Sequence, residues 1–128
     1  MRPVKAPVLF EDLTYKIIGA AMEVHKILGP IHKETVYQKA LEKEFFDRGL
    51  KVQREVDLPV KYGDIKVGTY RPDFVVNDSV VVEIKALEFL PKKTEVQLSY
   101  YLKVTGYKIG LLLNFGASSL EVRRRIYG

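Results

Sequence analysis

The stretch RPDFVVNDSVVVEIKA, residues 71–86, decides the fold. Two apolar runs flank the polar triplet at 77–79, a pattern that predicts two antiparallel strands joined by a three-residue loop. In that register Asp73 lies directly opposite Glu83 on the same face, with Cβ atoms about 5 Å apart. A two-residue loop would instead put the two acids on opposite faces of the sheet.

Glu83 and Lys85 stand on one face of a strand that is otherwise apolar, because strand side chains alternate between faces. Burying a charge is costly unless it is paired or bound to a metal. One interpretation is a solvent-facing Glu–Lys pair. The other is a site in which Asp73 and Glu83, two acids that repel each other, hold a hard cation such as Mg²⁺ or Mn²⁺. Lys85 would then stabilise a developing oxyanion or help to orient and deprotonate a water. Two acids, a hard cation and a lysine are the components that metal-assisted phosphodiester hydrolysis requires.

The composition narrows the class of protein. The chain has 128 residues, the size of one domain, and it has no cysteine, which excludes disulfides and thiolate metal sites. Lys and Arg outnumber Asp and Glu by 21 to 16, and the net charge of +5 favours an anionic partner such as nucleic acid, or else a solvated basic surface. No apolar run reaches the roughly 18 residues of a membrane span, and the N-terminus lacks an apolar signal core. We therefore expect a cytoplasmic protein.

The spacing of apolar residues predicts an α/β fold with a central mixed β-sheet flanked by helices. An N-terminal arm over 1–10 precedes a single domain over 11–128. Helical spacing is found from Asp12 to Leu28, at about 33–48 and at about 93–105, where Gly106 ends the helix. Strand patterns cover 52–60, 65–70, 74–76, 80–86 and 108–115, the last of these buried on both faces, and a basic edge strand is expected at 122–127. In outline the order is ααββββαβ.

Asp73, followed after nine residues by Glu83-Ile84-Lys85, resembles the D…(D/E)xK signature of the PD-(D/E)XK nuclease-like superfamily. The resemblance implies a restriction-endonuclease-like core, in which the two acids lie on adjacent antiparallel strands. Gln97 and Tyr101 are similar to the Q-x-x-x-Y motif of RecB-type nucleases and share one helix face. The alternative for that pair is an ordinary amphipathic helix with Tyr101 in the core.

A closer resemblance, over about 11–120, is to the GxxExxY protein family of the same superfamily. Its segments here are IIGAAMEVH at 17–25, LGP at 28–30, ETVY at 34–37, RPDF at 71–74, VEIKA at 82–86 and GLLLNFG at 110–116. Ile31 stands where the naming motif has its first glycine. The resemblance implies that Glu34 completes the metal site, although an acid in the first turn of a helix is also favoured by the helix dipole. Glu23 and His25 match as well but have no assigned chemistry, and His25 is expected to be structural or solvent-facing.

The combined interpretation is a metal-dependent nuclease that acts on nucleic acid, with DNA favoured over RNA and RNA left open. Asp73, Glu83, the Ile84 carbonyl and Glu34 would hold Mg²⁺ or Mn²⁺, Lys85 would assist catalysis, and Gln97 and Tyr101 would line the site. The residues expected to contact nucleic acid are Arg71, Lys92, Lys93, Lys103, Lys108, Arg123, Arg124 and Arg125. Two alternatives stay open: a catalytically silent module that binds nucleic acid or a protein partner, and a solvated strand face without function. The chain leaves little room for a separate recognition domain. A homodimer or a larger nucleic-acid-processing partner is the expected source of one.

Overall fold

The computed structural model describes residues 10–127, which form three helices and seven strands. The helices are α2 (Glu11–Leu28), α3 (Glu34–Asp47) and α4 (Lys92–Thr105). The strands are β1 (Val52–Arg54), β2 (Leu58–Tyr62), β3 (Ile65–Tyr70), β4 (Phe74–Val76), β5 (Val80–Lys85), β6 (Ile109–Asn114) and β7 (Glu121–Ile126). No helix in this part of the chain is long and apolar enough to cross a membrane.

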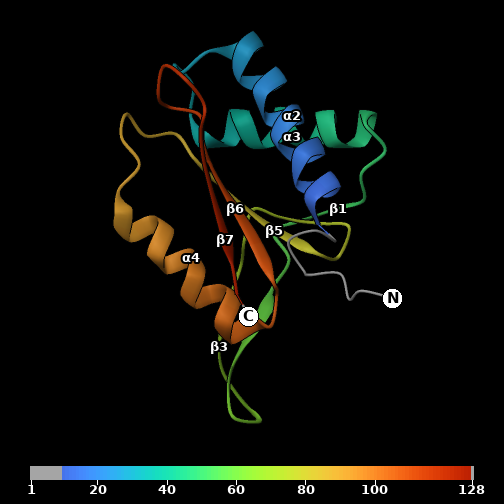
Figure 1. The fold of residues 1–128 in the computed structure, drawn as a ribbon, viewed down its shortest axis with the longest axis vertical. Helices are drawn as coiled ribbons and strands as arrows, with labels where there is room; N and C mark the ends of the chain where they lie inside the picture. Colours follow the sequence, from blue (N-terminus) through green and yellow to red (C-terminus); the bar gives the residue numbers. More distant parts are fainter. Residues whose placement is uncertain (1–9, 128) are drawn as a thin grey trace, which may run out of the picture.

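Five strands form one mixed sheet in the order β1-β4-β5-β6-β7, and β2 with β3 forms a separate two-stranded hairpin. Only β5 and β6 run parallel, because α4 connects them across one face of the sheet. The other neighbouring pairs are antiparallel. Figure 1 shows α4 on one side of this sheet and α2 with α3 on the other, which is the predicted mixed sheet flanked by helices.

Both faces of the central strands are buried, each in its own apolar cluster. Phe74, Val82 and Leu111 face α2 and α3, where Tyr37 and Phe45 complete the larger cluster. The smaller cluster lies under α4 and joins β4, β5 and β6 to the root of the hairpin. Every residue of β6 is buried, as its continuous apolar sequence predicts.

The β4–β5 hairpin has the predicted register: Phe74 pairs with Val82 and Val76 pairs with Val80. The loop is the three-residue Asn77–Ser79, and Asn77 and Asp78 have φ of 51° and 54°. Asn and Asp tolerate this left-handed conformation better than most residues, which explains why the loop closes without glycine.

The prediction of one continuous strand at 52–60 is wrong, because this segment is divided into β1 and β2. With β7 at the end, the outline ααββββαβ becomes ααβββββαββ. Glu55 interrupts it with a φ of 54°, and the chain leaves the main sheet to enter the hairpin. The alternation of apolar residues continues through the break, so the sequence pattern alone hides it. The predicted arm lies outside the described residues except for Phe10, which packs against the larger core cluster. The edge strand predicted at 122–127 is confirmed by β7.

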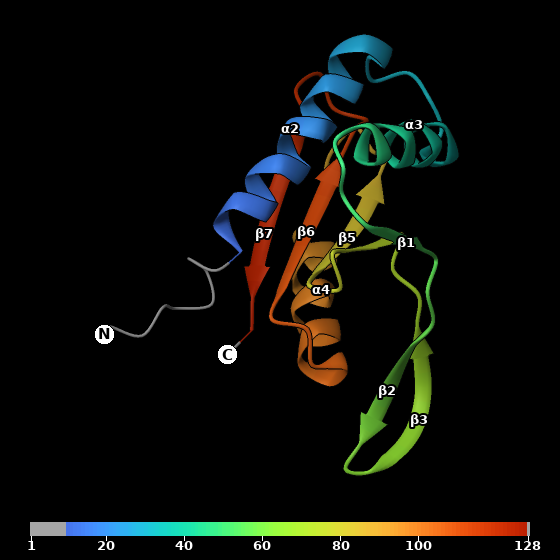
Figure 2. The same cartoon turned by 90° about the vertical axis from the view of Figure 1, so that its right-hand side faces the viewer.

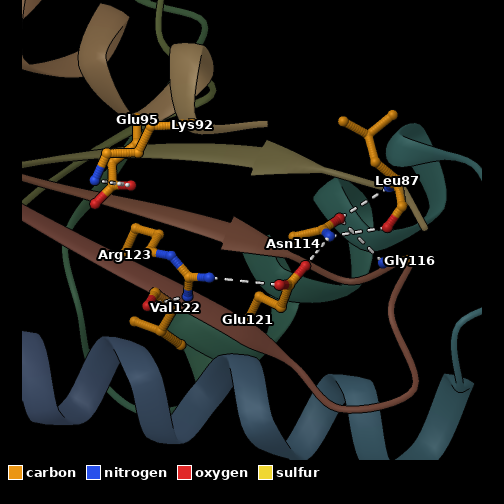
Figure 3. A network of polar contacts seen from close by, with 8 residues as sticks. All are labelled: Leu87, Lys92, Glu95, Asn114, Gly116, Glu121, Val122 and Arg123. Carbon is orange, nitrogen blue, oxygen red and sulfur yellow. Dashed lines mark hydrogen bonds and ion pairs between the residues drawn. The ribbon is translucent and has the colours of Figure 1, made fainter. Parts of the chain in front are cut away.

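The side chain of the buried Asn114 holds the segment that follows β5 in place through hydrogen bonds (Figure 3). The Oδ1 atom of Asn114 accepts hydrogen bonds from the backbone N–H groups of Leu87 at 2.8 Å and Gly116 at 3.2 Å. Its Nδ2 donates to the Leu87 carbonyl at 2.8 Å and to Glu121 Oε1 at 2.7 Å. Gly116 allows this approach, since a Cβ there would lie 2.4 Å from the Leu87 nitrogen. The chain is thereby held just after Lys85.

Replacing Asn114 by alanine should destabilise the protein by about 2–4 kcal/mol, because two buried backbone N–H groups and one carbonyl lose their partner. Urea unfolding measures the change in the free energy of unfolding. Gln53→Ala, on the exposed β1, is the control and should change stability by less than about 0.5 kcal/mol. Equal stabilities for the two variants would contradict this account of the Asn114 network.

Candidate active site

Asp73 directly precedes β4 and lies beside β5 in the extension of the observed register. Its Oδ2 accepts a hydrogen bond of 2.7 Å from the backbone N–H of Ile84. Its Oδ1 accepts one of 3.2 Å from Nε2 of Gln38, which comes from α3. The carboxylate is therefore fixed by a strand on one side and by a helix on the other.

Glu83 is the acid that faces the α4 side of β5, next to Val81 of the smaller cluster. Its Oε1 accepts a hydrogen bond of 2.9 Å from the hydroxyl of Tyr70, at the end of β3. The ring of Tyr70 is stacked on Tyr101 of α4, with centroids 3.8 Å apart and planes 7° from parallel. Tyr70 thus connects the hairpin, α4 and the acid of β5.

Burial is the main reason that ionisation of both acids is costly, and the charge of Asp73 adds to the cost at Glu83. Burial, and then the charge of Asp73, raise the pKa of Glu83 to about 7, against the opposing effects of the Tyr70 hydrogen bond and the charge of Lys85. Burial also raises the pKa of Asp73; the Ile84 N–H opposes this shift, and the charge of Glu34 adds to it. The sheet therefore holds two partly buried carboxylates whose negative charges are incompletely balanced.

The predicted site residues line two neighbouring hollows. The larger, of about 260 Å³, is lined by Glu34, Thr35, Gln38, Glu55, Arg71, Pro72 and Asp73. The smaller, of about 30 Å³, is lined by Tyr70, Glu83, Lys85, Thr94, Gln97, Leu98, Tyr101 and Leu112. Glu83, Lys85, Gln97 and Tyr101 are brought together as predicted, whereas Glu34 and Asp73 line the other hollow.

Glu34 is the first residue of α3 and its side chain is exposed. Its charge acts on Asp73, yet within residues 10–127 no group of three or more His, Cys, Asp or Glu side chains is arranged to hold a metal ion. Of the three predicted carboxylates, Glu83 lies on β5 and Asp73 lies directly before the adjoining β4. A ligand role for Glu34 stays a prediction.

Several of the basic residues predicted to contact nucleic acid already have acidic partners. Arg71 binds Asp57 at 2.6 Å, and Lys92 binds Glu95 at 3.3 Å. Arg125 also lies 3.8 Å from Glu95, since α4 packs beside β7. Arg123 binds Glu121 at 3.5 Å. Lys93, Lys103 and Lys108 are exposed.

Two residues of the matched segments have structural contacts. Tyr37 is fully buried, donates a hydrogen bond to the Gly29 carbonyl and stacks on Phe115 with centroids 4.7 Å apart. His25 holds the loop after β6, because its Nε2 lies 2.9 Å from the Ala117 carbonyl. The expectation that His25 is structural agrees with this contact.

Two residues of the site were not found from the sequence: Tyr70 and Gln38. Each reaches its acid from an element distant in sequence, and neither belongs to a spacing motif. The only signal was that the predicted strand at 65–70 ends on Tyr70, immediately before the RPDF segment.

A protein-family model described as PD-(D/E)XK nuclease superfamily matches residues 11–126. No curated protein matches the chain. The family match spans nearly every described element, including both strands that carry Asp73, Glu83 and Lys85. The chain therefore belongs to the PD-(D/E)XK nuclease superfamily.

Proposed function

We propose that the protein is a metal-dependent nuclease that hydrolyses phosphodiester bonds of nucleic acid, DNA in preference to RNA. One observation carries the proposal: the β4–β5 register, extended by one residue, places Asp73 opposite Glu83, with Lys85 next on the same face of β5. The superfamily match and the net charge of +5 support a nucleic acid as the substrate. The segments at 17–37 further support membership of the GxxExxY family.

The donor set fits Mg²⁺ or Mn²⁺. It consists of carboxylate oxygens, and a cation would stabilise the ionised form of both acids, whose pKa is raised by burial first and by neighbouring negative charge second. Mg²⁺ is usually held by one or two carboxylates and the substrate phosphate, so Asp73 and Glu83 suffice. The Ile84 carbonyl and Glu34, directly or through water, would complete the set. When bound, the ion would supply a Lewis acid and lower the pKa of the attacking water.

The remaining residues of the smaller hollow would position the reacting groups. Lys85 would hold a positive charge beside the phosphate oxygens, where negative charge develops during hydrolysis. Tyr70 would keep Glu83 in place through its hydrogen bond, and Tyr101 would support Tyr70 by stacking. Gln97, which also lines the smaller hollow, would hold Lys85 or a phosphate in position.

Contacts with the substrate backbone would come from basic residues of β7, of α4 and of the loops before β4 and β6, which would position nucleic acid without reading its sequence. These are Arg71, Lys92, Lys93, Lys103, Lys108, Arg123, Arg124 and Arg125. The second candidate function is a binding module of the same fold without turnover. It is favoured by the bonds that occupy both oxygens of Asp73, from Gln38 and from the Ile84 N–H.

Lys85→Ala should lower the cleavage rate by about 10²–10³-fold, because a preorganised charge at the reacting phosphate is lost. The measurement is cleavage of plasmid, linear duplex, single-stranded DNA and RNA in Mg²⁺, Mn²⁺ or EDTA. Lys16→Ala, an exposed lysine of α2 on the other side of the sheet, is the charge-matched control and should cleave like the wild type.

Metal-dependent cleavage that survives in Lys85→Ala would contradict the assignment of this lysine. Binding of nucleic acid without cleavage of any of these substrates would instead support the binding module. If Lys85→Ala keeps the far-ultraviolet circular dichroism spectrum and the melting temperature of the wild type, its loss of activity does not result from unfolding.

Glu83→Gln should remove much of the pH dependence of stability in EDTA. The pKa of Glu83 is about 7 in the fold and lies near its ordinary, lower value in the unfolded chain, so the fold favours the protonated acid. The wild type should therefore lose stability as pH rises from about 5 to 8, by roughly 1–3 kcal/mol relative to Glu83→Gln.

Urea unfolding at each pH measures this difference, and the histidines cancel because both variants contain them. Adding Mg²⁺ at pH 8 should stabilise the wild type more than Glu83→Gln. Parallel stability curves for the two proteins between pH 5 and 8 would refute a raised pKa at Glu83.

A further inference from the structure

The β2–β3 hairpin extends from the body of the protein, away from α2 and α3 (Figure 2). Only its root is buried: Leu58 and Tyr70 are 8% and 6% exposed and pack in the cluster under α4. Toward the tip, Tyr62 is 82% and Ile65 is 64% exposed. The hairpin is thus anchored at one end and surrounded by solvent at the other.

Lys61 and Lys66 are cross-strand partners in this hairpin. The pairing register shifts between Val60 and Lys61, and this irregularity separates the two exposed lysines from Leu58 and Val60, which belong to the smaller cluster. Side chains that are directly opposite in an antiparallel pair have Cβ atoms about 5 Å apart, and like charges at this distance destabilise the pair. The position of the two lysines therefore opposes formation of the hairpin.

The charge of Asp57 acts on Lys66 and offsets this repulsion only in part. Across residues 10–127, neither lysine forms an ion pair within 4.0 Å. Asp57, just before β2, is already bound to Arg71 through both carboxylate oxygens, at 2.6 and 3.3 Å. Two adjacent, exposed lysines that form no ion pair within 4.0 Å in the described part of the chain make a site for an anion from outside the chain, and the phosphates of nucleic acid are such anions.

The hairpin is connected directly to the candidate site, because β3 ends at Tyr70, whose hydroxyl donates to Glu83. Lys66 lies four residues before Tyr70 on the same strand, which corresponds to about 14 Å along an extended chain. This equals about four base-pair steps of B-form DNA. The tip between the lysines exposes Tyr62 and Ile65 beside the acid Asp64, and its apolar side chains match the mixed basic and apolar surfaces that enter nucleic-acid grooves.

We propose that the β2–β3 hairpin is a nucleic-acid-binding arm, in which Lys61 and Lys66 contact the phosphate backbone about four base-pair steps from the bond that is cut. This inference rests on the proposed nuclease function and adds to it a second contact surface outside the hollows. The arm raises affinity for the substrate and does not take part in the chemistry.

The test compares Lys61→Ala/Lys66→Ala with the wild type in binding to a fluorescein-labelled DNA duplex of about 20 base pairs, in EDTA and over a range of salt concentrations. Fluorescence anisotropy should give an affinity about tenfold lower for the double variant at low salt. The slope of log affinity against log salt should fall by about 1.8, for two lost phosphate contacts. Single-stranded DNA and RNA of the same length distinguish the nucleic acids that the arm accepts.

Lys16→Ala/Lys26→Ala is the matched control, since it removes the same charge from exposed positions of α2. It should weaken binding less than twofold and leave the salt slope within error. The hairpin variant should unfold at the same temperature as the wild type or higher, because it removes a repulsive pair. Weaker binding by this variant would therefore result from the loss of contacts with nucleic acid and not from unfolding.

Equal binding by the hairpin variant and the control, with a wild type that binds, would overturn the arm and leave the nuclease proposal standing. A wild type that binds none of the three nucleic acids would overturn both. A dimer in sedimentation equilibrium that Tyr62→Ser/Ile65→Ser breaks, with DNA binding unaffected by the lysine changes, would assign the hairpin to a second copy of the chain instead.

Discussion

The pairing of β4 with β5 is the constraint on which the rest of the structure depends. Both strands are buried on both faces, so their register cannot slip by one residue without turning Glu83 and Lys85 into the apolar cluster of α2 and α3. The three-residue loop then fixes Asp73 beside Glu83. The packing of the valines thus forces two acids that repel each other to lie close together. Burial of the valines stabilises the fold by far more free energy than this repulsion costs.

The features that could be predicted from the sequence are those encoded in adjacent residues. The NDS triplet gave the β4–β5 register, and the apolar run of β6 gave a central strand, because burial on two faces leaves no polar alternation. The break at Glu55 could not be predicted, since the apolar alternation continues across it while the backbone turns into the left-handed region. Tyr70 and Gln38 were missed because only the tertiary fold brings them to the acids.

The elements around the candidate site differ in how firmly they are held. The chain is fixed on both sides of Lys85: β6 pairs with β5 up to this residue, and Phe115 N–H donates to the Lys85 carbonyl at 2.8 Å. Beyond it, Asn114 binds both backbone groups of Leu87. Sites carried on such strands keep their geometry better than sites on loops. Lys85 is therefore positioned by the backbone, although its side chain reaches a surface hollow.

Glu34 and the hairpin are the less constrained components, and both are exposed where they would meet a ligand. Glu34 begins a helix, without a side-chain cap at its N-terminus, and Lys61 and Lys66 stand on a hairpin that is packed only at its root. A nuclease needs both kinds of component, because the reacting groups require fixed distances whereas the substrate must enter and leave. The division follows the burial pattern: residues on β4 and β5 are fixed by the core, whereas Glu34 of α3 and the tip of the hairpin are exposed to solvent.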